Sequence, residues 1–247
     1  MHIFAHRGAH DRFPENSIAA FEQAVSLGAD GIEFDVRLTK DNIPVAIHPV
    51  EVRDVVGING YVFNLTLDEL QSRPMRNVHQ EDEAVIPTLS DVLKNFAART
   101  RLDIEIKALE PEATELIAGE LRAVEMHWPT IEITCFEPAL IRDVRSQLPA
   151  ITVDLLIPRS EPWMTPEIVA HMALHRARLA GAHGVHLHPT QLSEAGVDGL
   201  REAGIEVHCW GVNNAEHFEA VRRFEITKFD TDHLEEILGF AGRNDDK

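Results

Sequence analysis

Three acidic residues interrupt otherwise apolar segments of this sequence. Glu33 and Asp35 are two positions apart in the segment GIEFDV, and Glu105 lies in LDIEI. In a strand, side chains two positions apart point to the same face. Carboxylates that are buried side by side must either take up a proton or bind a cation. Because oxygen ligands favour a hard ion, the three residues predict a site for Mg²⁺, Ca²⁺ or Mn²⁺.

Cationic and imidazole side chains accompany these carboxylates. Arg7 follows the first apolar run, and Lys107 lies two positions after Glu105. A phosphate group needs such fixed positive charges in an acidic protein. His6 and His48 end two apolar runs, and imidazole gives and accepts protons near neutral pH. Each residue alone also fits a structural role, such as an ion pair, but the complete set favours a catalytic site.

Short apolar runs that alternate with helical patterns would position these side chains. We expect strands at His2–His6, Gly31–Leu38, Leu102–Ile106, Ile131–Cys135, Ile151–Ile157, Gly184–Leu187, Ile205–Val212 and Ile226–Phe229. Helical spacing separates them at Ser17–Leu27, Leu89–Ala98, Glu112–Glu125, Pro138–Gln147, Pro166–Ala180, Ser193–Ala203 and Ala215–Phe224. Such alternation implies a parallel sheet of the α/β class. The number of units in this length fits a closed (β/α)₈ TIM barrel better than an open sheet.

One stretch breaks this alternation. Between about residues 48 and 87 the chain has short strands, a turn at Gly57–Gly60 and a brief helix near Leu67–Gln71. We interpret the stretch as a small insertion after the second strand, so that residues 1–247 form a single TIM-barrel domain. Catalytic groups of such barrels lie at the carboxyl ends of the strands, where the residues described above fall.

The composition limits the classes of function. The chain has 247 residues and a formal net charge of −18, from 23 Lys and Arg against 41 Asp and Glu. So acidic a protein is a poor candidate for nonspecific binding to nucleic acid or to an anionic membrane. No apolar run approaches the ~20 residues that cross a bilayer, and no targeting segment is visible. We therefore expect a cytoplasmic protein without stable membrane insertion. Cys135 and Cys209 are expected to be reduced and buried.

An ordered series of motifs resembles the glycerophosphodiester phosphodiesterase family. The segment from AHRGAHDRFPENS through GADGIEFDVRL to VAIHP follows the family pattern, and IPTLSDVL, LDIEIK, HCWGVNN and FDTD follow it in order. HRG alone would be weak evidence, whereas this series has matching spacing over almost the whole chain. The resemblance implies a TIM-barrel phosphodiesterase domain. It also implies metal-dependent hydrolysis of glycerophosphodiesters to sn-glycerol 3-phosphate and a free alcohol.

The resemblance also implies roles for individual residues. His6 and His48 would be the acid and base, although which is which stays open. Water, or the hydroxyl group of the substrate itself, would attack phosphorus. Glu33, Asp35 and Glu105 would bind one divalent cation, Mg²⁺ or Ca²⁺, with Mn²⁺ as an alternative. Arg7 and Lys107 would bind phosphate oxygens, and Trp210 would form an aromatic wall of the site. Trp210 also fits an ordinary core position.

Departures from the family pattern leave other functions open. Pro49 follows His48 where the family usually has Asp, so the orientation of His48 is uncertain. The alternatives are a lysophospholipase D-like enzyme on the same barrel, a metal-dependent hydrolase of another class, and a non-catalytic glycerophosphodiester-binding protein. The pair Arg7 and Lys107 favours a phosphate substrate, and the complete set of histidines and carboxylates favours turnover. The expected partner is a small-molecule glycerophosphodiester, whose head group the sequence does not specify.

A second group of histidines lies in the segment GAHGVHLHP. His186 and His188 are two positions apart on a predicted strand, so both could ligate one transition metal. A place for His186 in the wall of the substrate pocket and a structural role for both residues are the alternatives.

Overall fold

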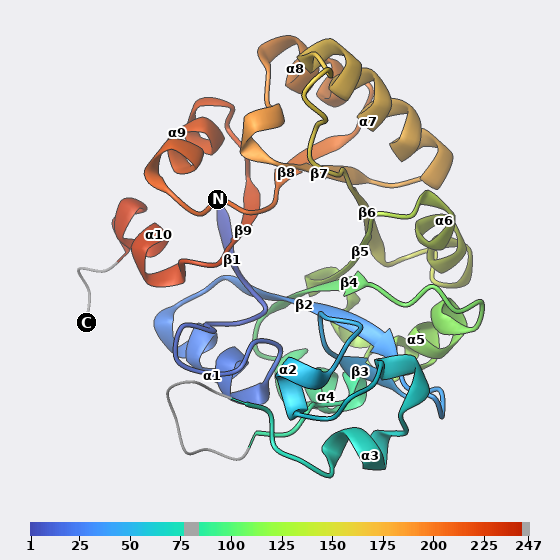
Figure 1. The fold of residues 1–247 in the computed structure, drawn as a ribbon. Helices are drawn as coiled ribbons and strands as arrows, with labels where there is room; N and C mark the ends of the chain where they lie inside the picture. Colours follow the sequence, from blue (N-terminus) through green and yellow to red (C-terminus); the bar gives the residue numbers. More distant parts are fainter. Residues whose placement is uncertain (77–83, 244–247) are drawn as a thin grey trace.

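The chain folds into a closed barrel of parallel strands surrounded by helices (Figure 1). The computed structural model describes residues 1–76 and 84–243. The strands follow the order β1-β9-β8-β7-β6-β5-β4-β2, and β1 pairs with β2 to close the ring. They are β1 (His2–His6), β2 (Gly31–Leu38), β4 (Arg101–Ile106), β5 (Ile131–Cys135), β6 (Thr152–Leu156), β7 (Gly184–Leu187), β8 (Glu206–Cys209) and β9 (Lys228–Thr231). The predicted TIM barrel is confirmed.

Helices cover the outside of the barrel (Figure 1). They are α1 (Ile18–Leu27), α4 (Leu89–Phe96), α5 (Ala113–Arg122), α6 (Pro138–Gln147), α7 (Pro166–Ala180), α8 (Glu194–Glu202), α9 (Ala215–Arg223) and α10 (Leu234–Phe240). Single 3₁₀ turns lie at η2 (Glu125–Thr130) and η3 (Pro189–Gln191). Within the described ranges, no helix combines the length and the apolarity that a membrane span requires.

The predicted element bounds are wrong in places. Strands β6 and β8 are shorter than predicted, and β9 begins two residues later. The apolar runs overestimate the strands because burial continues beyond the hydrogen-bonded ladder, as Ile157 and Val212 are buried in the loops. The sequence pattern also missed α10, whose seven residues are too few to show a helical period clearly.

Local signals explain where several helices begin and end. Ser17 accepts a hydrogen bond from the backbone N–H of Ala20 at the start of α1, and Gly28 ends that helix at φ 92°. Thr88 forms a capping box with Asp91 at the start of α4. Caps of this kind satisfy backbone groups that the first and last turns leave without partners.

The segment between β2 and α4 contains β3 (Pro44–Ala46), α2 (Arg53–Val56), η1 (Val62–Asn64) and α3 (Leu67–Gln71). Strand β3 pairs antiparallel with β2 and adds an edge strand beside the closed barrel. The brief helix predicted near Leu67–Gln71 is confirmed as α3, whereas helix α2 was not predicted. The segment has its own apolar cluster, which includes Val45, Val52 and Leu70. Residues 77–83 of the predicted insertion lie outside the described part.

The interior of the barrel carries buried charges. Lys228 on β9 forms ion pairs with Glu132 on β5 and with Asp154 on β6, the latter at 3.5 Å. The same Asp154 oxygen accepts hydrogen bonds from His186 at 3.3 Å and from His208 at 3.0 Å. Buried charges are tolerated only when they are paired in this way. This network fills part of the barrel interior. The carboxylates at the carboxyl-terminal end of the barrel are not part of it.

Candidate active site

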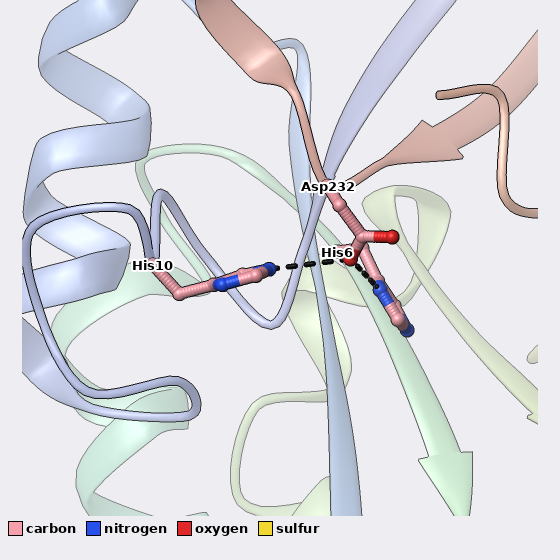
Figure 2. A group of neighbouring side chains, drawn as sticks. All are labelled: His6, His10 and Asp232. Atoms are coloured by element: carbon pink, nitrogen blue, oxygen red, sulfur yellow. Dashed lines mark hydrogen bonds and ion pairs between the residues drawn. The ribbon is translucent and has the colours of Figure 1, made fainter. Parts of the chain in front are cut away.

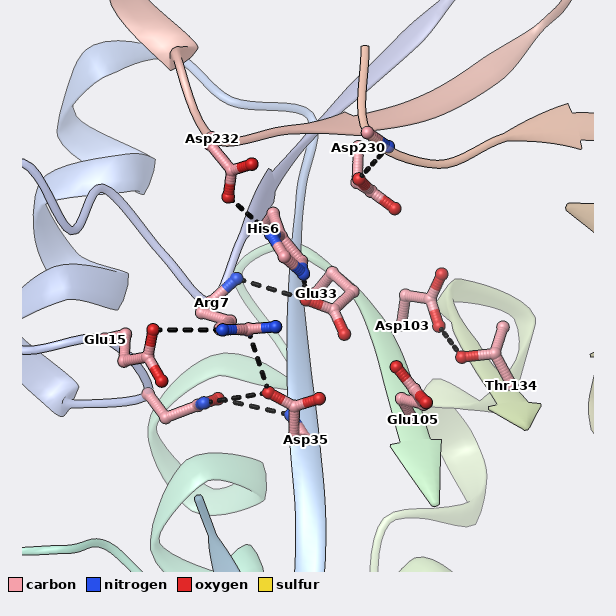
Figure 3. A network of polar contacts seen from close by, with 12 residues as sticks. His6, Arg7, Glu15, Glu33, Asp35, Asp103, Glu105, Thr134, Asp230 and Asp232 are labelled. Carbon is pink, nitrogen blue, oxygen red and sulfur yellow. Dashed lines mark hydrogen bonds and ion pairs between the residues drawn. The ribbon is translucent and has the colours of Figure 1, made fainter. Parts of the chain in front are cut away.

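Three carboxylates converge at the carboxyl-terminal end of the barrel (Figure 3). Glu33 and Asp35 lie on β2, and Asp35 is aligned in register with Glu105 on β4. One oxygen from each residue lies within 4.8 Å of the others, and all three side chains are buried. In the described ranges, Asp35 Oδ1 and Glu105 Oε1 have no polar partner other than the ammonium group of Lys107. The structure thus brings the predicted ligand set together and leaves two of its buried oxygens with one shared cationic partner.

The alternation of β2 directs these groups inward. Phe34, between Glu33 and Asp35, points the other way and packs against Phe21 of α1 with ring centroids 5.6 Å apart. Asn16 then fixes Asp35. The Nδ2 group of Asn16 donates to Asp35 Oδ2 at 3.0 Å, and its Oδ1 accepts from the backbone N–H of Asp35 at 3.2 Å. Asn16 has a φ of 59°, a conformation that asparagine tolerates better than most residues.

Two cations lie against the carboxylates. Arg7 Nε is 3.2 Å from Asp35 Oδ2, and Arg7 Nη1 donates to Glu15 at 3.1 Å. Lys107 Nζ is 2.6 Å from Glu105 Oε1 and 3.4 Å from Asp35 Oδ1. Each cation therefore has part of its charge compensated inside the protein, and each borders the cavity.

The turn that follows β1 places Arg7. Both Arg7 and Gly8 are in the left-handed region, at φ 56° and 83°. A Cβ atom at Gly8 would lie 2.8 Å from backbone and side-chain atoms of Ala20, so only glycine fits there. The backbone N–H of Arg7 donates to the carbonyl of Glu33 at 2.8 Å and lies 3.1 Å from its carboxylate.

Burial and charge perturb all three carboxylates. Burial raises the pKa of Glu33 well above its usual value. Burial also raises the pKa of Glu105 to about 7, although Lys107 opposes the shift. Burial alone would raise the pKa of Asp35, but Arg7 and Lys107 outweigh it and lower the pKa. Three carboxylic acids with such different pKa values thus lie side by side. A divalent cation bound between them would stabilise the ionised form of all three.

His6 is held by a carboxylate that directly follows the neighbouring strand β9. Its Nδ1–H donates to Asp232 Oδ1 at 2.5 Å, and the same oxygen accepts from His10 Nε2 at 3.2 Å (Figure 2). A carboxylate only accepts, so the proton lies on Nδ1 of His6. The other nitrogen, Nε2, lies 3.8 Å from Glu33. Burial alone would lower the pKa of His6, but Glu33 and the hydrogen bond to Asp232 raise it to about 10.

His48 has the opposite surroundings. It follows β3, and its backbone carbonyl accepts from Arg37 Nε at 2.8 Å. Burial lowers the pKa of His48 to about 4. Asp35 opposes this shift, whereas Arg7 and Lys107 reinforce it. The imidazole is therefore neutral, and the Arg37 contact holds the main chain immediately before Pro49.

One cavity of about 280 Å³ joins these groups. Seven of the eight predicted site residues line it, namely His6, Arg7, Glu33, His48, Glu105, Lys107 and Trp210. Asp35 is fully buried and reaches the cluster from beneath the lining. On the far wall, Trp210 donates through Nε1 to the carbonyl of Ile157 at 3.1 Å. Trp210 therefore borders the cavity, as predicted, and a hydrogen bond fixes its ring.

Sequence reasoning missed several residues of the site. Asp232 was recognised only as part of the FDTD motif, and His10 and Arg159 carried no signal at all. Asn16 lies in the AHRGAHDRFPENS motif, but nothing in the sequence indicates that it orients Asp35. Contacts between β9 and β1 join residues 226 positions apart, and no spacing pattern indicates them.

His186 and His188 of the GAHGVHLHP segment do not lie at one common site. His186 contacts Asp154 in the barrel interior, while His188 contacts Arg159 at the cavity. The oxygens and nitrogens of Asp154, His186 and His208 lie within 4.8 Å of one another. Protons of the histidines and the ammonium group of Lys228 already occupy this cluster. Burial lowers the pKa of His186 to about 3, so its ring is neutral.

Comparison with known proteins identifies the family. The model of the glycerophosphoryl diester phosphodiesterase family matches residues 6–236. The chain belongs to this family. It is 32% identical over 247 residues to a glycerophosphodiester phosphodiesterase from Caldanaerobacter subterraneus subsp. tengcongensis, with 97% of each chain covered. Membership confirms the resemblance found in the sequence and the expectation of an enzyme that hydrolyses phosphodiesters.

Solved structures confirm the fold. A phosphodiesterase from Oleispira antarctica, determined in complex with the product sn-glycerol-3-phosphate, superposes with a TM-score of 0.83 at 22% identity. The match covers 98% of this chain and 97% of that one. A glycerophosphodiester phosphodiesterase from Agrobacterium tumefaciens gives a TM-score of 0.80 at 20% identity, with 97% and 99% covered.

Proposed function

We propose that this phosphodiesterase hydrolyses glycerophosphodiesters to sn-glycerol 3-phosphate and an alcohol, using one divalent cation and two histidines. The observation that carries the proposal is the cluster of Glu33, Asp35 and Glu105. It is buried and lies beside two cations in the cavity of a chain that belongs to this family. The product named for the Oleispira antarctica structure supports the identity of the phosphate product.

The three carboxylates fit a hard divalent cation. Mg²⁺, Ca²⁺ and Mn²⁺ all take carboxylate oxygens, and in the described ranges Asp35 Oδ1 and Glu105 Oε1 have only Lys107 as a polar partner. When bound, such an ion would act as a Lewis acid on a phosphate oxygen. Arg7 and Lys107 would bind the remaining phosphate oxygens and stabilise the charge that develops on them.

The surroundings of the two histidines support different roles. His6 lies between Asp232 and Glu33, which favours its protonated form, so we assign it as the acid that protonates the departing alkoxide. His48 is neutral beside Arg7 and Lys107, so we assign it as the base that removes a proton from the nucleophile. The nucleophile is either water or a hydroxyl group of the substrate. The phosphorus–oxygen bond to the leaving alcohol breaks as the new one forms.

Release of glycerol 3-phosphate from a panel of glycerophosphodiesters tests the proposal. The panel contains glycerophosphocholine, glycerophosphoethanolamine and glycerophosphoglycerol, each with Mg²⁺, Ca²⁺ or Mn²⁺ and again with EDTA. We expect turnover that EDTA abolishes and that added cation restores. Turnover that persists in EDTA would refute the requirement for a divalent cation. A folded, cation-loaded protein that binds these diesters without cleaving them would be the non-catalytic binding protein.

A second candidate function has one observation in its favour. A cavity of about 260 Å³ adjoins the other side of Lys107, and mostly apolar side chains line it, among them Val50, Val62, Phe63 and Leu109. Such a surface suits the acyl chain of a lysophospholipid, as a lysophospholipase D-like enzyme would require. Release of choline from lysophosphatidylcholine at a higher kcat/KM than from glycerophosphocholine would favour this function.

A further inference from the structure

One cation of the active-site cavity differs from the other two. Arg7 and Lys107 both form ion pairs with carboxylates. Arg159 also lines the cavity, shortly after the end of β6. No carboxylate in the described ranges lies within ion-pair distance of its guanidinium group. In the ring of eight strands β6 stands opposite β1 (Figure 1), so Arg159 follows the strand across the barrel from the one that ends in His6.

Arg159 keeps its positive charge uncompensated. Its polar contact is a hydrogen bond from Nη2 to Nε2 of His188 at 3.0 Å. Burial lowers the pKa of His188 to about 4, and Arg159 and His217 reinforce the shift, so the acceptor is a neutral imidazole. A neutral partner positions the guanidinium group without cancelling its charge.

A strip of aromatic rings connects Arg159 to the phosphate site. Lys107 Nζ lies 5.5 Å from the ring centre of Phe136, and the Phe136 and Trp210 rings are 6.4 Å apart. The Arg159 guanidinium then lies 5.6 Å from the Trp210 ring centre. A group that extends from a phosphate at Lys107 along this wall passes two aromatic rings and reaches Arg159.

The leaving alcohol is the part of the substrate that fits this wall. The hydroxyl groups of glycerol are oxygen ligands of the kind that a divalent cation prefers, so glycerol belongs on the side of Glu33 and Glu105. The alcohol on the other side of phosphorus then extends toward Trp210. A quaternary ammonium group would need an open face of that ring, but the Arg159 guanidinium already lies against it.

We propose that Arg159 makes the enzyme prefer glycerophosphodiesters whose leaving alcohol carries an anionic group, a carboxylate or a phosphate, over those with a cationic alcohol. This inference rests on the proposed function, because it assigns the specificity of the same cavity. Arg159 is partly open to solvent, and exposed ion pairs are worth only modest free energies. The expected preference is therefore about fivefold for each charge, rather than absolute.

Two matched pairs of substrates isolate this charge. Glycerophosphoserine differs from glycerophosphoethanolamine by one carboxylate, and glycerophosphoglycerol phosphate differs from glycerophosphoglycerol by one phosphate. In each pair we expect the wild-type kcat/KM to be higher for the more anionic substrate by about fivefold or more. Arg159→Gln should reduce both ratios to about one, and Arg159→Lys should preserve most of the preference. Arg142→Gln removes the same charge from the exposed surface of α6 and should leave both ratios unchanged.

The outcomes separate this inference from the proposed function. If no member of either pair is hydrolysed, the proposed function fails. If all are hydrolysed with wild-type ratios near one or below it, the function stands and the preference for an anionic alcohol is refuted. If the preference exists but survives unchanged in Arg159→Gln, another residue causes it and the role of Arg159 is refuted.

Discussion

Asp232→Asn should disable His6 by reversing its hydrogen bond. The backbone N–H of Asp232 donates to Asn213 Oδ1 at 2.8 Å, so the side-chain NH₂ of Asn213 faces the Asp232 carboxylate and donates to its Oδ2. A new amide at position 232 must therefore turn its oxygen toward Asn213 and its NH₂ toward His6. Nδ1 of His6 then becomes an acceptor, so the ring loses its Nδ1 proton and its positive charge and keeps only the proton on Nε2. A neutral imidazole is a far weaker acid than an imidazolium.

The size of the effect follows from the bond that is lost. A hydrogen bond to a charged group contributes about 1.5–3 kcal/mol, which corresponds to roughly 10- to 150-fold in rate. Removing the orienting carboxylate from a catalytic histidine in a serine protease lowers kcat by ~10⁴ through the wrong tautomer. We expect Asp232→Asn to lower kcat by about 10²–10⁴ with little change in KM. Release of glycerol 3-phosphate measures kcat, and ¹⁵N NMR of the His6 ring reports which of its nitrogens are protonated.

An exchange of the two side chains provides the matched control. In the double variant Asp232→Asn with Asn213→Asp, the carboxylate at position 213 can accept from the new amide NH₂. The amide oxygen is then free to face His6 and to accept a hydrogen bond from its Nδ1–H again. We expect the double variant to recover at least about tenfold of the lost kcat. A single variant within threefold of wild type, or a double variant no better than the single, would refute this reasoning.

Further predictions concern the cation, pH and stability. Glu105→Gln should weaken binding of Mg²⁺ or Ca²⁺ at least about tenfold, as titration calorimetry would show, because one anionic ligand is lost; equal affinity would contradict the site. With saturating cation, the acidic limb of kcat/KM should lie below the ordinary histidine range. The lowered pKa of about 4 keeps the His48 base neutral until the pH falls that far; a limb near pH 6.5 would exclude this role. Lys228→Met should lower the free energy of unfolding by about 3–5 kcal/mol in urea, because it leaves Asp154 charged and buried without its ion pair. The exposed control Arg142→Met should stay within about 0.5 kcal/mol of wild type.

Much of the fold was readable because its signals are local. The alternation of apolar and polar residues in GIEFDV gives both the strand and the inward direction of Glu33 and Asp35. Helix α1 begins at its Ser17 cap and ends at Gly28, as those residue types predict. The bounds of β6 and β8 were less accurate, since an apolar residue such as Val212 stays buried after the strand has ended.

The cavity was readable only in part. Two rules predicted the cluster of three carboxylates and the two cationic side chains beside it. Carboxylates two positions apart on a strand share a face, and barrel sites lie at the carboxyl ends of strands. The same rules say nothing of Asp232, because its contact with His6 joins the last strand to the first. They say nothing of Arg159 either. Its charge is uncompensated because no carboxylate in the described ranges lies within ion-pair distance of it.

The sequence by itself determined the residue types, the faces on which they lie and the order of the strands. Those properties depend on side-chain chemistry and on spacing over a few residues. Only the tertiary structure decided the protonation of the two histidines. The pKa of His6 is raised because Glu33 and Asp232 flank it, and the pKa of His48 is lowered because the ring is buried and Arg7 and Lys107 lie near it. Charge acts through space over several ångströms, so residues far apart in the chain set these properties once the barrel has closed.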